Sequence, residues 1–433
     1  MRKIKTGIIV RLMKFFADLH IHSKYSRAVS KSMVLEELDR WADDKGILVM
    51  GTGDFTHPAW FKELKQKLEL AEPGLFKLKK KFKLKTIKGT FAETRFMLTV
   101  EISCIYTRGG RGRRVHHIVF APDIETAEKI NTQLSWIGNL ASDGRPIIGL
   151  DSEELAKIVF NANPRAVIVP AHVWTPWFSV FGSMSGFDSL EECFGEYAKN
   201  IFAIETGLSS DPQMNWRVKS LDKIALISNS DSHSLQRIGR EANVFDTELS
   251  YSGIMDAIKS RNPKKFLNTI EFFPEEGKYH YDGHRACGVV MPPKESKKLK
   301  DICPKCEKKM TLGVVYRVDQ LADSKRPEGY QDPKRVPYKN LVTLDSIIGE
   351  ALDVGKAAKS VMKEYEKLIK NFKSEFNILL NASVKEIALA SKPEIAEGVA
   401  RVRGGKLTIK PGYDGEFGVI KIFSDEDRKK IGS

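Results

Sequence analysis

Cysteine is scarce in this chain of 433 residues, which contains only five. Three of them lie close together between Cys287 and Cys306, so they do not form the evenly spread framework of a disulfide-stabilised protein. We therefore expect a reducing, cytoplasmic location. The sequence also lacks any run approaching the roughly 20 apolar residues of a membrane-spanning helix, and we expect no membrane partner.

Acidic residues are outnumbered by basic ones. Asp and Glu together number 56 against 70 Lys and Arg, which gives a formal net charge of +14. Such a surplus favours a polyanionic partner, although a Lys-rich thermophile surface is the plain alternative. The length exceeds that of a usual single core and predicts two or three domains. Internal repeats and low-complexity segments are absent.

Histidine is absent after His284, and seven of the nine histidines lie beside carboxylates in the first 233 residues. The groups are Asp18-Leu-His20-Ile-His22, Asp54-Phe-Thr-His57, Glu101, His116-His117, Pro170-Ala-His172 and Asp231-Ser-His233. Imidazole and carboxylate are the ligands that borderline and hard divalent metals prefer. Any one group alone is usually a loop or a hydrogen-bonded core residue. The whole set predicts a multinuclear metal centre and therefore a hydrolase.

Short apolar runs alternate with amphipathic segments over the first 270 residues, which predicts repeated βα units and a parallel α/β sheet. The expected strands cover residues 15–21, 47–54, 95–101, 115–121, 166–171, 201–205 and 224–228. The metal-type residues lie at or just past the ends of these runs. Because the carboxyl ends of barrel strands converge on one mouth, we expect a (β/α) barrel rather than an open sheet.

Strand alternation indicates which side chains face this mouth. Residues two apart point the same way, so His20 and His22 are expected to bind one ion together. Adjacent residues point oppositely, and we take His116 rather than His117 as the ligand. Glu101 has two oxygens with which to bridge two ions. Glu205 ends another strand, where it either orients a ligand or is simply solvated.

The order of these groups resembles the PHP superfamily of metal-dependent phosphoesterases, which are distorted seven-stranded barrels holding three metal ions. The resemblance implies divalent ions (Zn²⁺ and/or Mg²⁺ or Mn²⁺) in three positions. Their implied ligands are His20, His22, Glu101 and Asp231 for the first, Glu101, His116 and His172 for the second, and His57 with His233 for the third. Asp18 and Asp54 then join Glu101 and Asp231 as catalytic or orienting carboxylates. The spacing Asp54-Phe-Thr-His57 departs from the adjacent Asp-His pair of many members.

A second metal site is predicted where two ligand pairs with two-residue spacers follow one another. These are His284 with Cys287 and Cys303 with Cys306, a pattern typical of structural zinc. His280 lies one turn upstream and is an alternative fourth ligand. Cys104 and Cys193 have no such neighbours, so we expect them in the core.

Two segments are candidate DNA contacts. Arg108, Arg111, Arg113 and Arg114 surround three glycines just before His116, where guanidinium groups can grip phosphate. The loop after His172 carries Trp174 and Trp177, which could stack on bases. The plain alternatives are a solvated hairpin tip and core aromatics.

The order of parts narrows the resemblance to the endonuclease Q family. Its carriers are Gly51-Thr-Gly-Asp-Phe-Thr-His-Pro58, Tyr279-His-Tyr-Asp-Gly-His-Arg-Ala-Cys287, the Cys-Pro-x-Cys knuckle and a helical tail. It implies a PHP barrel over 13–275, a zinc-binding ribbon over 276–326 and a mainly helical C-terminal domain over 327–433.

The implied activity is DNA repair. A monomer would nick double- or single-stranded DNA on the 5′ side of uracil, hypoxanthine, xanthine or an abasic site, leaving 3′-hydroxyl and 5′-phosphate ends. Family members cooperate with the sliding clamp, but the Gln-x-x-aliphatic-x-x-aromatic-aromatic clamp motif is absent here. The alternatives are a PHP-type small-molecule phosphatase and a non-enzymatic DNA-binding scaffold.

Overall fold

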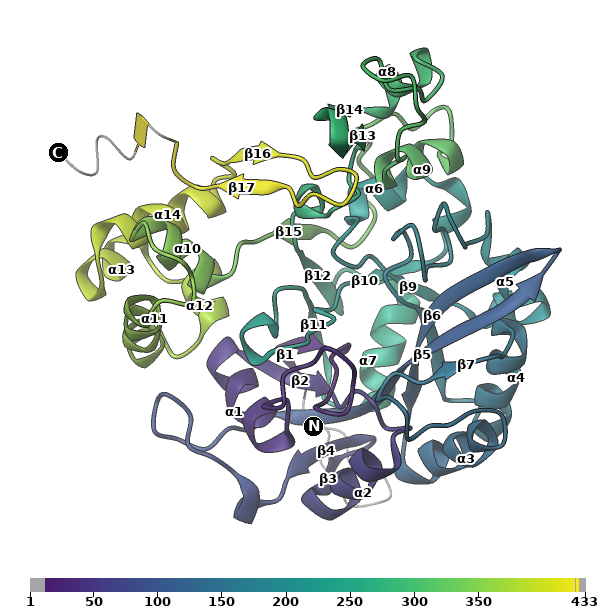
Figure 1. Cartoon of the computed structure of the whole chain (residues 1–433). Coiled ribbons are helices and arrows are strands. Elements are labelled where there is room, and N and C mark those ends of the chain that lie inside the picture. The colour runs from purple at the N-terminus through teal and green to yellow at the C-terminus, as the bar shows by residue number, and fades with distance from the viewer. Residues whose placement is uncertain (1–11, 425, 428–433) are drawn as a thin grey trace.

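The computed structural model describes residues 12–424 and 426–427 and is built around one large mixed sheet (Figure 1). Its order is β15-β12-β11-β1-β2-β5-β4-β3, with β6 and β7 also paired to β5 and β8 paired to β6. The strands up to residue 271 are β1 (Leu12–Asp18), β2 (Ile47–Gly51), β3 (Leu68–Glu72), β4 (Leu75–Leu78), β5 (Arg95–Arg108), β6 (Arg111–Ala121), β7 (Ile147–Ile148), β8 (Val167–Pro170), β9 (Ala203–Glu205), β10 (Ala225–Ile227), β11 (Ala242–Glu248) and β12 (Phe266–Glu271). β9 and β10 form a separate parallel pair.

The sheet is mixed, which corrects the expectation of a parallel sheet. β1 and β5 run parallel to β2, whereas β11 is antiparallel to β1 and β6 is antiparallel to both β5 and β8. The reason lies at Gly109 and Gly110, whose φ angles of 61° and 71° turn β5 directly into β6 without a crossover helix. The long hairpin that results projects from the body in Figure 1.

The strands follow a curved path around one core. Two hydrogen bonds connect the separate pair β9–β10 to the strands on either side of it. The amide of Val173, just after β8, donates to the carbonyl of Glu205 at 3.2 Å. On the other side, the Asn243 side chain of β11 donates to the Ser228 carbonyl at 2.7 Å. Among the described strands β9 and β10 pair only with each other, so the backbone ladder is interrupted on both sides of that pair.

Helices cover the outside of these strands and begin and end at recognisable signals. They are α1 (Leu35–Lys45), α2 (Pro58–Lys67), α3 (Ile124–Ser135), α4 (Ser152–Ala162), α5 (Leu190–Phe194), α6 (Pro212–Trp216) and α7 (Tyr251–Ser260). Asp151 and Ser250 cap α4 and α7 by accepting backbone N–H groups. Gly46 ends α1 with a φ of 91°.

The strands and helices up to residue 271 are called the barrel domain, or the barrel, below, after the predicted fold. A small unit with its own core follows them. It contains β13 (Asp282–His284), β14 (Val289–Met291), α8 (Pro293–Lys298) and α9 (Val314–Leu321). Its core is only Val289, Met291, Cys303 and Met310. A core of this size provides little hydrophobic stabilisation, which is the usual reason for a structural metal.

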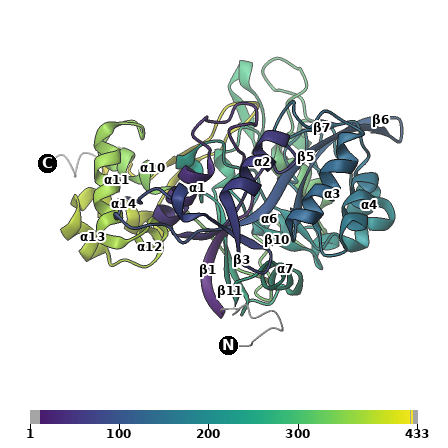
Figure 2. The ribbon, with the colours of Figure 1, turned by 90° about the horizontal axis from the view of Figure 1, so that it is seen from below.

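The remaining chain first adds β15 (Tyr338–Asn340) to the main sheet beside β12 and then becomes helical. The helices are α10 (Leu344–Ala351), α11 (Lys359–Phe372), α12 (Glu375–Leu380), α13 (Val384–Ala390) and α14 (Pro393–Arg403). Figure 2 shows this helical group on the side of the barrel opposite α3 and α4. The hairpin β16 (Thr408–Lys410) and β17 (Val419–Lys421) then returns to the small unit, where the Tyr281 amide donates to the Gly412 carbonyl.

The helical group shares the hydrophobic core of the barrel. Phe376 of α12 stacks on Phe16 of β1 with ring centroids 4.4 Å apart. Among the described residues, no helix is both long and apolar enough to cross a bilayer.

Candidate metal centre

Six of the predicted ligands converge on one site. Glu101 and His116 come from the middle of the long strands β5 and β6, and the other four come from segments that follow strands. The ligand atoms of His20, His22, Glu101 and Asp231 all lie within 4.8 Å of one another. Those of Glu101, His116 and His172 form a second group by the same measure. Glu101 belongs to both groups, so the two candidate ion positions are neighbours that share one carboxylate.

The two oxygens of Glu101 face different partners. Oε2 lies 3.3 Å from Nε2 of His22, while Oε1 lies 2.7 Å from Nδ1 of His116 and 2.9 Å from Nε2 of His172. Asp231 completes the first group, with Oδ1 3.1 Å from Nε2 of His22. This is the arrangement expected of a carboxylate that bridges two ions.

Carboxylates behind two of the histidines fix how their rings are oriented. Nδ1 of His20 donates to Glu205 at 3.0 Å, and Nδ1 of His22 donates to Asp54 at 3.1 Å. Because ionised carboxylates only accept hydrogen bonds, Nδ1 carries the hydrogen and the Nε2 lone pair is left for a metal. Glu205 thus proves to be an orienting group.

The interior of the centre contains buried polar atoms that a cation would satisfy. Nε2 of His20, Nε2 of His22 and Oδ1 of Asp231 are buried without a hydrogen-bond partner among the described residues. Unpaired buried polar atoms cost free energy, and these three point into the same small space. The donor set therefore fits a divalent metal ion.

Three residues at the mouth have backbone angles that non-glycine residues rarely adopt. The φ angles of Asp54, His172 and Asp231 are 52°, 31° and 45°. Each conformation costs about 1–3 kcal/mol, and each occurs in the segment that follows a strand, namely β2, β8 or β10. Gly207 makes room for this at His172, since a Cβ there would lie 2.5 Å from the His172 Cβ.

The electrostatics favour a charged bridge and act differently on the individual imidazoles. Although burial opposes it, Glu205 raises the pKa of His20 well above the ordinary value, and Asp231 and Asp54 do the same for His22. A bound metal would therefore displace the second proton of these two rings.

Burial opposes ionisation of Glu101, but the hydrogen bonds that it accepts from His116 and His172, together with the charge of Arg145, hold its pKa well below the ordinary value. Burial lowers the pKa of His116 to about 4, which leaves the ring neutral at physiological pH. Carboxylate and neutral imidazole are the forms that bind metals.

Asp18 and Asp54, predicted as catalytic or orienting carboxylates, accept hydrogen bonds from the segments around the centre. Asp18 is fully buried and accepts the Ser230 amide at 3.0 Å and the Gly239 amide at 2.9 Å. Burial raises its pKa to about 6. Asp54 accepts from Ser23, Ser26 and His22. Neither belongs to a group of candidate ligands, and their contacts fit the orienting role, while a catalytic role stays a prediction.

Neither His57 nor His233 belongs to a group of three or more candidate ligands among the described residues, so the third ion position stays a prediction. His57 stacks on Tyr25 with centroids 4.3 Å apart. Nδ1 of His233 donates to the Asp231 carbonyl at 2.9 Å. The strand alternation places His117 outward as expected, with Nε2 2.8 Å from Ser152 Oγ.

Arg145 is a functional candidate that sequence reasoning missed. Its Nη1 donates to Glu101 Oε2 at 3.0 Å, and its side chain is 28% exposed, so it reaches the centre from the solvent side. A single arginine in a loop without histidines carries no sequence signal. The tight approach of Gly144, whose Cβ would lie 2.2 Å from Asp54 Oδ2, brings this loop to the centre.

The second predicted site also comes together. His284, Cys287, Cys303 and Cys306 place one ligand atom each within 4.8 Å of the others. Although burial opposes it, the Lys305 and Cys306 backbone N–H groups lower the pKa of Cys303 to about 6, which favours thiolate. His280 lies outside the group and is buried, which lowers its pKa to about 4.

The arginines of the hairpin differ in their availability. Arg108 is paired with Asp151 and Glu153 at 3.2 and 3.0 Å, and Arg113 donates to the Gly186 carbonyl and lies over the Phe187 ring. Arg111 and Arg114 are exposed and make no side-chain hydrogen bond or ion pair within residues 12–424 and 426–427. These two are therefore the arginines free to meet a phosphate.

The two tryptophans also separate. Trp174 is 1% exposed and donates through Nε1 to Asn215 Oδ1 at 2.8 Å, so it is a core residue, and the expectation that it contacts DNA is wrong. Trp177 is 36% exposed and packs edge-on against Tyr279. One tryptophan of this loop therefore packs in the core, and the other lies at the surface.

Comparison with solved structures finds two close matches over nearly the whole chain. The lesion-specific endonuclease PfuEndoQ from Pyrococcus furiosus is 31% identical, with a TM-score of 0.81 over 96% of this chain and 99% of that one. Endonuclease Q bound to a 27-mer duplex with an abasic lesion at the active site is 32% identical, with the same TM-score over 96% and 98%.

Two relatives found by sequence match this chain, one over nearly its whole length and one over part of it. The uncharacterized protein YqxK of Bacillus subtilis is 28% identical over 431 residues, covering 95% of this chain and all of that protein. The uncharacterized protein MJ0043 of Methanocaldococcus jannaschii is 33% identical over 258 residues, 58% of this chain but only 31% of that protein. The family model described as the MJ0043 C-terminal domain matches residues 343–406, which span α10 to α14.

Proposed function

This chain belongs to the endonuclease Q family, and we propose that it is a metal-dependent DNA repair endonuclease. In this proposal it hydrolyses the phosphodiester on the 5′ side of uracil, hypoxanthine, xanthine or an abasic site and leaves 3′-hydroxyl and 5′-phosphate ends. The observation that carries it is the pair of buried ligand groups sharing Glu101, within a fold matched to a lesion-specific endonuclease over 96% of the chain.

His20, His22, Glu101 and Asp231 would hold one divalent ion, and Glu101, His116 and His172 would hold a second. Such ions, when bound, generate hydroxide near neutral pH and neutralise the charge that develops on phosphate oxygens. We propose Zn²⁺ or Mg²⁺ or Mn²⁺ in these positions and a structural Zn²⁺ on His284, Cys287, Cys303 and Cys306.

The residues around the ions would orient the ligand histidines and hold the phosphodiester. Glu205 and Asp54 keep the Nε2 atoms of His20 and His22 aimed inward through their hydrogen bonds to Nδ1. Arg145 lies at the solvent side of Glu101, where its guanidinium would grip the non-bridging oxygens of the bound phosphodiester. Positioning by charged groups of this kind is the main contribution that a protein makes to phosphate chemistry.

Contacts with DNA outside the centre would come from the exposed cations of the hairpin. Arg111 and Arg114 have no intramolecular partner among the described residues, and Trp177 offers an exposed ring beside Tyr279. In this proposal the barrel over 13–275 carries the chemistry, the unit over 276–326 holds zinc, and the segment from 327 adds to the substrate surface.

The test is a cleavage assay on end-labelled duplexes that carry one uracil, hypoxanthine or abasic site, beside an undamaged duplex, with magnesium and with chelator. We expect a metal-dependent nick 5′ to the lesion only. Asp231→Asn should abolish the nick while DNA binding persists, and Asp256→Asn, an exposed residue of α7, is the matched control. Hydrolysis of a simple phosphomonoester without any nick would favour a small-molecule phosphatase. Binding without cleavage by the metal-loaded wild type would favour a scaffold.

A further inference from the structure

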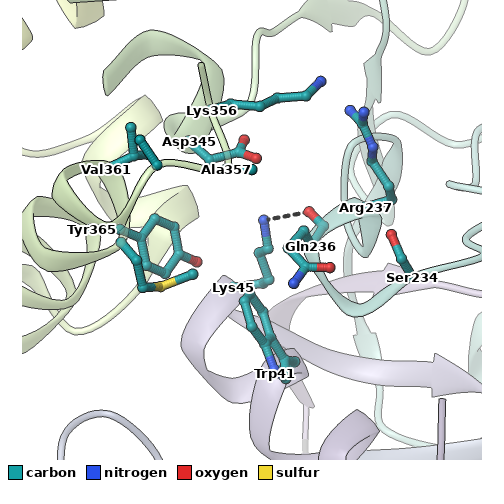
Figure 3. Close-up of a pocket in the computed structure, with 12 residues that line it drawn as sticks. Trp41, Lys45, Ser234, Gln236, Arg237, Asp345, Lys356, Ala357, Val361 and Tyr365 are labelled. Atoms are coloured by element: carbon teal, nitrogen blue, oxygen red, sulfur yellow. Dashed lines mark hydrogen bonds between the residues drawn. The ribbon is translucent and has the colours of Figure 1, made fainter. Parts of the chain in front are cut away.

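A pocket of about 320 Å³ opens between the barrel and the C-terminal helices (Figure 3). Four segments of the chain line it: helix α1, the loop containing Ser234 to Arg237, the first turn of α10, and the region from Lys356 through the first two turns of α11. The pocket is separate from the metal centre, and the functional assignments above do not use it.

The floor of the pocket is fixed and its charge is balanced. Lys45 lies over the rings of Trp41 and Tyr365 and pairs with Glu375 at 2.6 Å. It also donates to the Gln236 carbonyl at 3.1 Å, the bond drawn in Figure 3. A lysine held by this many partners is not available to a ligand. The floor therefore bounds the pocket but offers no free charge to an anion.

The rim, by contrast, holds two cations without a hydrogen-bonded or ion-paired partner among the described residues. The charge of Glu276, which lies outside the pocket lining, acts on both of them. Arg237 and Lys356 reach toward each other from opposite sides of the opening in Figure 3. Neither side chain makes a hydrogen bond or an ion pair within the described ranges 12–424 and 426–427. The one carboxylate on the wall, Asp345, accepts the Ser346 amide at 2.9 Å.

Two like charges that face the same space repel each other unless an anion lies between them. The pKa of Lys356 reflects this, because burial lowers it and the charges of Arg237 and Arg240 lower it further, against Asp345 and Glu276. An arginine paired with a lysine is a common way to bind phosphate, since the guanidinium grips two oxygens and the ammonium adds a point charge.

The loop that contains Arg237 also contains Asp231, a candidate ligand of the metal centre. Asp231 and His233 precede Arg237 in the same segment, and Arg240 donates to the carbonyls of Ser230 and Asp231 at 2.9 and 3.4 Å. Arg237 lies four positions after His233 in the chain, a span of at most about 14 Å. Phosphates of one DNA strand recur about every 3.4 Å along the helix axis. A strand cleaved at the metal centre therefore has further phosphates within this distance.

We propose that Arg237 and Lys356 form a second phosphate subsite that binds the DNA backbone a few nucleotides from the cleaved bond. The proposal rests on the function proposed above. It assigns a role to the C-terminal helical region, which supplies Lys356 and closes one side of the pocket. The occupant is the phosphate of the substrate strand rather than a free nucleotide.

The experiment compares Arg237→Gln, Lys356→Gln and the double variant with Lys363→Gln/Lys370→Gln, whose lysines are exposed on α11 outside the pocket. Binding to a duplex with one abasic site is measured over a range of salt concentrations. Each pocket substitution should weaken binding about 3- to 10-fold and reduce the slope of log K against log salt by about 1. Turnover at saturating DNA should stay close to that of the wild type.

A second set of duplexes locates the contact. Each carries one uncharged methylphosphonate linkage at a different position along the cleaved strand. The wild type should lose affinity at one position near the nick, and the double variant should be insensitive at that position alone. Equal sensitivity of both proteins at every position, or pocket variants that behave like the α11 control, would overturn the subsite.

The two proposals fail in different ways. A wild type that binds lesion DNA without nicking it contradicts the endonuclease, while the salt and methylphosphonate measurements still decide the subsite. A wild type that nicks correctly, with a double variant that matches the control, contradicts the subsite alone. Competition of the DNA by inorganic phosphate at low millimolar concentration in the wild type, lost in the double variant without any positional effect, would assign the pocket to a free anion instead.

Discussion

Lys45 of α1 and Glu375 of α12 form an ion pair of 2.6 Å in which the two side chains are only 3% and 4% exposed. The pair connects the barrel to the C-terminal helices. Glu375 also accepts from the Tyr365 hydroxyl and the Leu344 amide, at 2.8 and 3.0 Å, so its oxygens are fully used. Removing one partner of such a pair leaves an uncompensated buried charge.

Lys45→Met should therefore lower the free energy of unfolding by about 3–5 kcal/mol. Equilibrium denaturation measures the change, and Lys65→Met is the control because Lys65 and Glu128 form a pair of similar length that is about half exposed. The control should change stability by less than about 1 kcal/mol. Adding Glu375→Gln to Lys45→Met should recover part of the loss. Equal effects of the two lysine substitutions would contradict the structural role of the buried pair.

Glu205→Gln tests how the carboxylates behind the ligands act. The amide keeps the size of the side chain but no longer supplies the anionic acceptor for His20 Nδ1, so we expect metal affinity or cleavage to fall about 10- to 100-fold. Titration of the metal-free protein with Zn²⁺ or Mn²⁺ gives the affinity, and excess metal should restore part of the turnover with an unchanged KM for DNA. Glu248→Gln, at the end of β11, is the control. A variant whose loss lies in KM alone would assign Glu205 to DNA binding instead.

Much of the centre follows from the sequence because its signal is the position of residues relative to strands. His20, His22, Glu101 and Asp231 stand at or after apolar runs, and strand ends meet at one mouth whatever the exact pairing. The same logic separated His116 from His117, since adjacent strand residues face opposite ways. These inferences needed only local periodicity.

What the sequence could not give depends on the three-dimensional neighbours of single residues. Arg145 has no pattern around it, and only the folded loop brings it to Glu101. Trp174 was misjudged because an aromatic after a ligand suits a core as well as a stacking surface. The expectation of a parallel sheet is wrong for β5 and β6, because Gly109 and Gly110 connect these strands by a tight turn rather than by a crossover helix.

Cys303→Ser should remove the zinc of the small unit and leave the barrel metals in place. Thiolate ligation is the main stabilising element of a unit whose core is four side chains, so we expect loss of one zinc per chain and early unfolding of this region. Elemental analysis gives the metal content, and limited proteolysis should show new cleavage between β13 and α9. Cys193→Ser, a buried cysteine outside the cluster, should keep its zinc. Full zinc content in Cys303→Ser would refute the assignment.

Glu271 makes the stability of the barrel depend on pH. Burial raises its pKa from 4.5 to about 8, against the hydrogen bonds that it accepts from Thr269 and Thr206. Between these values the folded protein binds a proton that the unfolded chain has released, so stability is full below about pH 4.5 and falls as pH rises toward 8. The loss is at most about 1.4 kcal/mol for each pH step of one in that interval. Glu271→Gln is neutral at every pH and should flatten this dependence, leaving the variant more stable than the wild type at pH 8.5.

Thermal unfolding from pH 5 to 9 measures the stability of both proteins, with Glu248→Gln as the control. If the stability of the wild type and of the variant falls in parallel as the pH rises, Glu271 is already ionised in the folded protein.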